Sequence, residues 1–306
     1  MFKSVKKAVF PVAGMGTRIL PATKAVPKEM LTVVDKPLIQ YAVDEALAAG
    51  IEHIIFVTGQ GKTALEDHFD RSDRLETLLT ARGKNTILDE MRTAELRDGA
   101  ISYVRQSKAL GLGHAVWCAR HIVGNEPFAV ILPDDYCLAK TPVLKQMMDH
   151  YQQHGGNMVA ITEVPKEKTN KYGILDVGQD FGHSVSINGL VEKPNPEDAP
   201  SNLSIIGRYI LQPEIFDHLQ FQEMGAGNEI QLTDAMAKLI GHQPFHGIRY
   251  EGDRFDCGDR AGYVKAILAT ALGRPDLQED IQDFFTKRVE VVTSQNKTVP
   301  LTVTIA

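Results

Sequence analysis

The sequence lacks any long hydrophobic run. No apolar stretch approaches the roughly 18 to 20 residues that a membrane-spanning helix needs. Residues 1–7 are rich in lysine and lead into an apolar run of strand length, not into the hydrophobic core of a signal peptide. We therefore expect a cytoplasmic protein that makes no membrane contact.

Cysteine and excess positive charge are also scarce. The three cysteines, Cys118, Cys137 and Cys257, are odd in number and far apart. That spacing is typical of free buried thiols in a reducing compartment and offers no metal-binding pattern. The formal net charge of -6 argues against a nucleic-acid partner, because a general nucleic-acid surface needs a basic excess to neutralise phosphates.

The chain does contain enough apolar sequence for a substantial core, with 306 residues of which 43% are hydrophobic. Strand-like and helix-like segments alternate through its first half. Strands are predicted at residues 7–12, 53–58, 101–106 and 128–132, and helices at 35–49 and 114–123, with two or three more between 61 and 99. Such alternation predicts an α/β fold with a mainly parallel central sheet flanked by helices.

After Asp134 the pattern changes. Strands at residues 158–164, 172–177, 184–191 and 204–211 follow one another without helices, which predicts hairpins and a small β extension of a mixed sheet. Helices are predicted at 142–154, 213–218, 230–240 and 261–272, with a strand at 245–251. The tail from Val289 alternates weakly, and an edge strand, an oligomer contact and a loose terminus all remain open for it.

A glycine pair follows the first predicted strand. Gly14 and Gly16 end the apolar run, and Arg18, Lys24 and Lys28 follow within a dozen residues. Glycines after a strand let backbone N–H groups turn toward an anion, and the cations add charge that the amides alone lack. The stretch is therefore predicted to bind phosphate.

Two other kinds of phosphate loop fit less well. A dinucleotide loop needs a third glycine at the position where Ile19 stands. A Walker loop is approximated at residues 56–63, which end in Gly61, Lys62 and Thr63, but Phe56 stands in the place of its first glycine.

Several side chains near the glycine pair suit a polyanion. Arg18 offers a planar fork for phosphate oxygens. Pro27 fixes the backbone before Lys28, so that the ammonium is held in one place. Glu29 is predicted to pair with one of these cations or to accept a sugar or ribose hydroxyl, while Lys24 is open between a ligand contact and a solvated charge.

Asp134, at the end of a buried predicted strand, is the first metal candidate. Mg²⁺ prefers one or two carboxylates and completes its shell with water and substrate phosphates. Asp256, where a strand runs into a glycine turn, is the second carboxylate. Asp135 and Asp259 are interpreted as turn formers or helix N-caps.

Two further sites suit a nucleobase and a sugar phosphate. The carboxamide of Gln106 has an acceptor and donors that match the imide edge of uracil or thymine. Glu192 can accept two sugar hydroxyls, and the adjacent Lys193 can meet the phosphate of the same molecule.

Taken together, six segments resemble the nucleotide-sugar pyrophosphorylases and, within them, the bacterial UTP-glucose-1-phosphate uridylyltransferases, also called UDP-glucose pyrophosphorylases. The segments are 10–49, 106 with 110–115, 133–135, 171–173, 191–194 and 255–258, and the resemblance covers roughly residues 5–273. It departs at Thr32, where the family commonly has proline. The resemblance implies a Rossmann-like nucleotidyltransferase fold, Mg²⁺ dependence and a homo-oligomer, either a dimer or a tetramer.

The resemblance also implies a division of the chain and of its site. Residues 1–275 would form the catalytic domain, with a nucleotide-binding half at about 1–140 and a sugar-binding half at about 141–275, and residues 276–306 an extension. The nucleotide would be held by Ala13, Gly14, Gly16, Glu29, Gln106, Gly111 and Asp134, and the sugar phosphate by Gly173, Glu192 and Lys193. Catalysis would rest on Arg18, Lys28 and Lys193, and the metal on Asp134 and Asp256.

The expected reaction joins UTP and glucose 1-phosphate into UDP-glucose and pyrophosphate. The sugar phosphate is already an anionic nucleophile, so no side-chain base is required. A thymidylyltransferase that uses dTTP, or an enzyme that uses both nucleotides, is the alternative, because Gln106 suits either base. A dinucleotide-binding oxidoreductase would need the third glycine that this sequence lacks, and a noncatalytic sugar-nucleotide sensor would not need Asp134.

Overall fold

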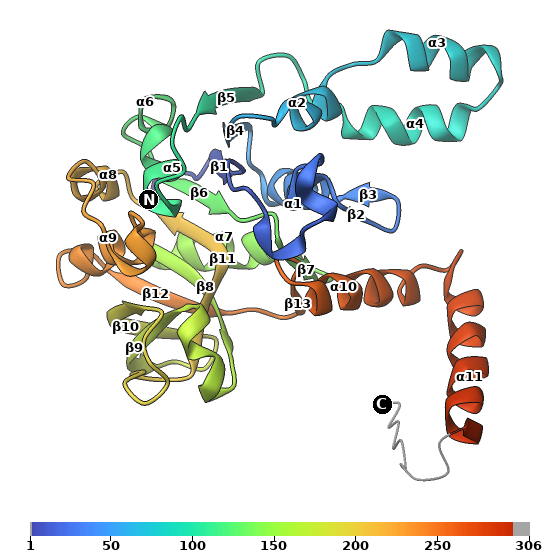
Figure 1. Cartoon of the computed structure of the whole chain (residues 1–306). Coiled ribbons are helices and arrows are strands. Elements are labelled where there is room, and N and C mark those ends of the chain that lie inside the picture. Colours follow the sequence, from blue (N-terminus) through green and yellow to red (C-terminus); the bar gives the residue numbers. More distant parts are fainter. Residues whose placement is uncertain (1, 296–306) are drawn as a thin grey trace.

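The strands of the first half form one side of a nine-stranded sheet and pair with one another in parallel (Figure 1). The computed structural model describes residues 2–295. In it, β1 (Lys7–Pro11) lies between β4 (His53–Thr58) and β6 (Phe128–Ile131), and β5 (Ile101–Arg105) pairs with the other edge of β4. All three pairings are parallel, as predicted from the alternation of strands and helices.

The second half extends the same sheet with mostly antiparallel strands. β11 (Leu203–Leu211) pairs with β6, and β8 (Asn157–Glu163), β12 (Phe245–Arg249), β10 (Ser184–Glu192) and β9 (Gly173–Asp180) follow in that order. Among the described strands of this half, only β8 and β12 pair in parallel. The mixed sheet is thus confirmed, but the prediction that it is mainly parallel holds for the first half alone. A short turn such as the one that joins β9 to β10 can only link antiparallel strands.

Helices cover both faces of the sheet. Successive side chains of a strand point to opposite faces, so Ala8 and Phe10 pack in one core and Val9 in the other. The first core is closed by α1 (Leu38–Ala49), α2 (Thr63–Phe69) and α7 (Val143–His154). The second is closed by α5 (Leu112–Cys118), α6 (Arg120–Val123), α8 (Ile215–Leu219) and α9 (Leu232–Leu239).

Several boundaries differ from the predicted ones. The helix expected to open at 35–37 begins at Leu38, because Lys36–Pro37 forms β3, which pairs with β2 (Thr32–Val33). It ends as predicted at Gly50, which adopts the left-handed conformation with φ 98°. The helix expected at 114–123 begins at Leu112 and breaks at Ala119 into α5 and α6. A pair of short strands, β7 (Asp135–Leu138) and β13 (Asp253–Asp256), forms a small sheet beside the large one.

Two helical pieces stand away from the sheet (Figure 1). One is the hairpin of α3 (Asp73–Ala81) and α4 (Asn85–Ala94), and the other is α11 (Gln278–Gln295), which follows α10 (Arg260–Leu272). The strand-like alternation at Val291 and Thr293 was misleading, because these residues lie in α11. The rest of that pattern, from Val299 onward, lies outside the described residues. Within residues 2–295, no helix combines the length and apolarity that crossing a membrane requires.

Candidate active site

A cleft of about 680 Å³ lies where the loops after β1 and β6 meet the start of β9 and the end of β10. Ligands of open α/β sheets bind in this region, beyond the carboxyl ends of the parallel strands. The charged residues that line the cleft are Arg18, Asp134, Asp135, Lys171, Glu192, Lys193, Glu229, Arg254, Asp256 and Asp259. Carboxylates and cations are therefore mixed along its walls.

The glycine turn follows β1 and folds back over Lys28. The N–H of Val12 donates to the carbonyl of Val57, which extends the pairing with β4 just past the strand. Gly16 has φ 66°, and a Cβ there would lie 3.0 Å from the Cβ of Lys28. Both the left-handed backbone and the close approach require glycine at this position.

Lys62 anchors the glycine turn from behind. Its ammonium donates to the carbonyl of Gly14 at 2.8 Å and to Oε2 of Glu29 at 2.8 Å. The Glu29 side chain is fully buried, and burial raises its pKa although Lys28 and Lys62 oppose the shift. Lys62 is occupied by these contacts, which argues against the Walker-loop reading of residues 56–63.

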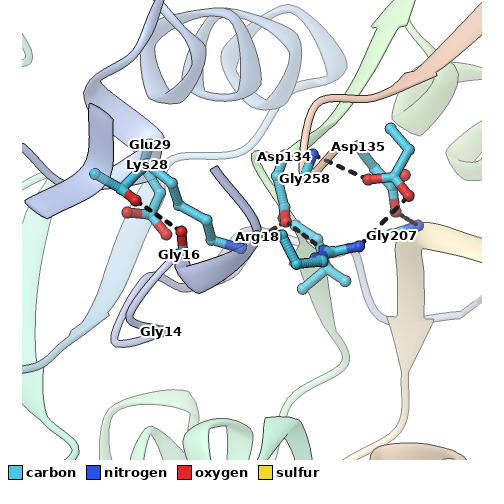
Figure 2. Close-up of polar contacts among 12 residues, drawn as sticks. Gly14, Gly16, Arg18, Lys28, Glu29, Asp134, Asp135, Gly207 and Gly258 are labelled. Atoms are coloured by element: carbon cyan, nitrogen blue, oxygen red, sulfur yellow. Dashed lines mark hydrogen bonds and ion pairs between the residues drawn. The ribbon is translucent and has the colours of Figure 1, made fainter. Parts of the chain in front are cut away.

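Lys28 and Arg18 converge on Asp134 (Figure 2). Lys28, in the short 3-10 turn Lys28–Met30, donates from Nζ to Oδ2 of Asp134 at 2.5 Å. One guanidinium nitrogen of Arg18 lies 3.8 Å from Oδ2 of Asp134, and the other lies 3.7 Å from Oδ2 of Asp256. Two carboxylates from different parts of the chain thus share the charge of a single arginine.

Burial and charge act in opposite directions on these groups. Burial by itself would raise the pKa of Asp134, but the charges of Lys28 and Arg18 and the hydrogen bond from Lys28 lower it overall. Burial would lower the pKa of Lys28, yet Asp134 and Glu29 raise it. The pKa of Asp256 is raised, first by burial and then by the neighbouring carboxylate of Asp135. Lys28 and Asp134 therefore stay charged as a pair at neutral pH.

Gln106 and Gly111 lie in the loop between β5 and α5. The Gln106 N–H donates to the carbonyl of Thr58, which continues the pairing of β5 with β4. Its carboxamide nitrogen reaches the carbonyl of Gly111 at 3.1 Å. Gly111 has φ 107°, and a Cβ there would lie 2.8 Å from the Ile230 carbonyl oxygen. Glycine is thus required at position 111 whatever ligand binds beside it.

The wall opposite Asp134 is formed by β9 and β10. Glu192, the last residue of β10, lies beside Gly173, the first residue of β9. A Cβ at Gly173 would lie 3.2 Å from Oε2 of Glu192, so a larger residue would crowd this carboxylate. Lys193 has the unusual φ of 46° for a residue with a side chain, and its ammonium lies 3.2 Å from Oε1 of Glu192. Backbone strain of this kind often marks a functional position.

Asp259 has the N-cap role that the sequence predicted, whereas Asp135, expected as a turn former or helix N-cap, is the first residue of β7 and fixes two neighbouring groups with its carboxylate. Asp135 accepts a hydrogen bond from the Gly207 N–H at 2.9 Å and another from Nε of Arg254 at 2.6 Å. Asp259 caps α10 by accepting from the Gly262 N–H at 2.8 Å. These contacts leave Asp134 and Asp256 as the aspartates of the cleft for a ligand or metal.

The structure brings many of the predicted site residues together. Arg18, Asp134, Gly173, Glu192, Lys193 and Asp256 line the cleft, and Lys28 contacts Asp134 directly. Ala13, Gly14 and Gly16 form the turn beside Lys28, while Gln106 and Gly111 lie next to Leu112, which lines the cleft. Glu29 is brought into the loop but is buried against Lys62, with its side chain away from the open space.

Sequence reasoning missed Lys62, Arg254 and Thr233. The signal for Lys62 was present in Gly61-Lys62-Thr63 but was compared only with a Walker loop. Arg254 holds Asp135 in place, and its guanidinium lies 5.1 Å from the ring centre of Tyr172. Thr233 lines the cleft from α9, a helix that the sequence connects to no motif.

Comparisons with known proteins identify the family of the chain. A family model described as Nucleotidyl transferase matches residues 7–271. The UTP–glucose-1-phosphate uridylyltransferase of Komagataeibacter xylinus is 56% identical over 260 residues, which make up 85% of this chain and 92% of that protein. The chain belongs to this uridylyltransferase family.

Solved structures of UDP-glucose pyrophosphorylases share the fold. One, complexed with UDP-glucose, has a TM-score of 0.81 and 46% identity, over 88% of this chain and 100% of that one. The UTP-bound enzyme from Acinetobacter baumannii has a TM-score of 0.85 and 42% identity, over 92% of this chain and 99% of that one. The family match over residues 7–271 spans the strands of the sheet and the residues that line the cleft.

Replacing Lys62 by Met should affect both stability and the glycine turn. Loss of the cation leaves the buried Glu29 carboxylate without its partner, which is expected to cost about 3–5 kcal/mol in free energy of unfolding. The double variant Lys62→Met/Glu29→Leu should recover most of that loss, as measured by urea denaturation.

The two variants also separate stability from binding. Both lack the donor to the Gly14 carbonyl, so both should show a raised KM for UTP, whereas Lys24→Met, which changes an exposed lysine of the same segment, should not. A double variant with restored stability and a wild-type KM would contradict the anchoring role of Lys62.

Proposed function

We propose that the chain uses this cleft to transfer the uridylyl group of UTP to glucose 1-phosphate, giving UDP-glucose and pyrophosphate. The observation that supports this is the placement of Arg18 and Asp134 in the same cleft as Glu192 and Lys193. Arg18, together with a metal ion on Asp134, suits a triphosphate, and Glu192 with Lys193 suits a sugar phosphate. Both reactants can therefore be held side by side.

The reaction needs orientation and charge neutralisation more than proton transfer. A phosphate oxygen of glucose 1-phosphate attacks the α-phosphorus of UTP in line, and pyrophosphate leaves. Both reactants are polyanions, and their repulsion opposes the attack. Lys28, Arg18 and Lys193 lower that repulsion. Lys28 is held in place by its hydrogen bond to Asp134, so little reorganisation of this cation accompanies the reaction.

Each group of residues takes one part of the substrates. The turn of Ala13, Gly14 and Gly16 offers backbone N–H groups to the phosphates of UTP, and Gln106 and Gly111 hold the uracil. Gly173, Glu192 and Lys193 hold the glucose phosphate. Glu29 supports the glycine turn through Lys62 and does not touch the nucleotide, because its side chain is fully buried.

Mg²⁺ is the cofactor that fits the donor set. Asp134 and Asp256 supply hard oxygen ligands, and their shared interaction with Arg18 indicates that positive charge is favourable between them. Among residues 2–295 no cluster of three or more His, Cys, Asp or Glu side chains forms a complete metal cage. Phosphate oxygens and water would therefore complete the shell, as Mg²⁺ prefers. When bound, the ion would add charge neutralisation at the phosphates.

The dTTP alternative is not favoured. The curated relative and both solved neighbours are named for uridine nucleotides or UDP-glucose. Gln106 would pair with thymine as readily as with uracil, so the preference has to come from the space around the 5-methyl group and the ribose 2′-hydroxyl. Comparing UTP with dTTP in one assay measures it.

Lys28→Ala should reduce catalysis much more than stability. The variant removes one of the fixed cations at the phosphates, so kcat for pyrophosphate release from UTP and glucose 1-phosphate should fall about 10²–10³-fold. The melting temperature should fall by about a few degrees only, because Asp134 loses its main partner but keeps Arg18 nearby. Lys24→Ala serves as the control. Equal turnover of wild type and Lys28→Ala would refute the role, and a wild type without activity would refute the function.

Metal removal should stop the reaction. EDTA is expected to abolish pyrophosphate release, and added Mg²⁺ should restore it. Asp134→Asn and Asp256→Asn should each raise the Mg²⁺ concentration needed for half-maximal rate by about tenfold or more, because each removes a charged ligand. Asp283→Asn, on the exposed part of α11, should have no effect. Full activity in EDTA would rule out the metal.

We further propose that α11 carries a homo-oligomer contact. The helix extends from the end of α10, away from the sheet (Figure 1), and Phe284 on it is 53% exposed. Light scattering should give a dimer or tetramer mass for the wild type and a smaller mass for Phe284→Lys. Gln282→Lys, a change at an exposed polar position of the same helix, should keep the wild-type mass. A monomeric wild type would contradict the proposal.

A further inference from the structure

A histidine is hydrogen-bonded to the side chain proposed to read the base. Gln106 follows β5, and His114 lies in the first turns of α5. The carboxamide Nε2 of Gln106 lies 3.1 Å from the Gly111 carbonyl oxygen and 3.0 Å from Nδ1 of His114. Both contacts are made by the same amide nitrogen, and the Gln106 side chain is buried.

These contacts determine which way the amide faces. A backbone carbonyl can only accept a hydrogen bond, so the Gln106 atom that faces Gly111 must be the NH2 group. Its second hydrogen points to Nδ1 of His114, which must therefore act as the acceptor. Both amide hydrogens are then used inside the protein, and the carboxamide oxygen is the atom of this group left to a ligand.

The surroundings of His114 favour the neutral ring that this arrangement needs. Burial lowers the pKa of His114 below its ordinary value. The His114 ring stacks on the Trp117 ring, with 6.0 Å between their centroids. The guanidinium carbon of Arg120 lies 3.5 Å from the centroid of the Trp117 ring. The titratable neighbour is Cys118, whose Sγ lies 3.9 Å from Nδ1 and whose pKa is raised by burial despite Arg120. Its thiol stays uncharged at neutral pH.

We propose that His114 is a positioning residue that, by holding the amide of Gln106, makes this side chain offer only a hydrogen-bond acceptor to the nucleobase. Uracil presents an N3–H donor and can pair with that acceptor, whereas N3 of cytosine is itself an acceptor and faces it unfavourably. The inference rests on the assignment of Gln106 to the base under the proposed function, and it adds the residue that sets the polarity of that contact.

The arrangement has a defined response to pH. Protonation of His114 places a hydrogen on Nδ1, opposite the NH2 group of Gln106, so that two donors face each other. The amide then loses its fixed orientation, and the KM for UTP should rise as pH falls through the pKa of His114. Asparagine at position 114 carries an oxygen at the place of Nδ1, so it can accept the same hydrogen bond without titrating between pH 5 and 8.

The experiment compares four variants by steady-state kinetics with UTP and with CTP. His114→Leu removes the acceptor and should raise the KM for UTP roughly fivefold, the loss expected for one hydrogen bond, with kcat within about twofold of wild type since no reacting atom is touched. The ratio of kcat/KM for UTP over CTP should fall. His114→Asn should keep the wild-type KM at pH 8 but lose its rise at acidic pH. His121→Asn, at an exposed histidine of α6, should behave as wild type.

Gln106→Ala separates the two levels of the argument. If it leaves the KM for UTP unchanged, the assignment of Gln106 to the base fails, and the inference fails with it. If Gln106→Ala weakens UTP binding but His114→Leu does not, only the role of His114 is overturned. Should His114→Leu fail to fold, the pH profile of His114→Asn decides, because an unchanged acid-side rise of KM in that variant would refute the inference.

Discussion

The ion pair between Lys28 and Asp134 is the interaction on which the organisation of the cleft depends. It joins the loop after β1 to the loop after β6, two neighbouring parallel strands, and it brings the ammonium to the place where phosphates would lie. Arg18 extends this pairing to Asp256, which comes from β13. Opposite charges thus connect three separate parts of the chain near the carboxyl ends of β1 and β6.

A second, more deeply buried ion pair, between Lys62 and Glu29, keeps the glycine turn in place. Lys62 and Glu29 are almost completely buried, so each depends on the other for its charge to be tolerated. One oxygen of Glu29, Oε1, has no hydrogen-bond partner within the described part of the chain. Burying this pair costs desolvation free energy, and in return the Lys62 ammonium fixes the direction of the Gly14 carbonyl.

Much of the fold and of the cleft could be predicted from local patterns. The spacing of apolar residues predicts β1, β4 and α1 clearly. The roles of Gly16, Lys28 and Asp134 were predicted from the few residues around each of them. What failed is not encoded in the short pattern around each residue. The buried state of Glu29 follows from Lys62, and the helical state of Val291 follows from the helix that it continues, not from its alternating pattern. The direction of β11 beside β6 is likewise set by tertiary pairing, which local periodicity does not encode.

The continuous sheet has a consequence for how the molecule comes apart. β6 from the first half and β11 from the second are hydrogen-bonded neighbours, and side chains from both halves share the same two cores. A fragment that ended near residue 140 would expose an unpaired strand edge and lose α7, α8 and α9 from its faces. The two halves of the chain therefore share one sheet and its two cores, and a cut near residue 140 would uncover apolar surface on both sides of it.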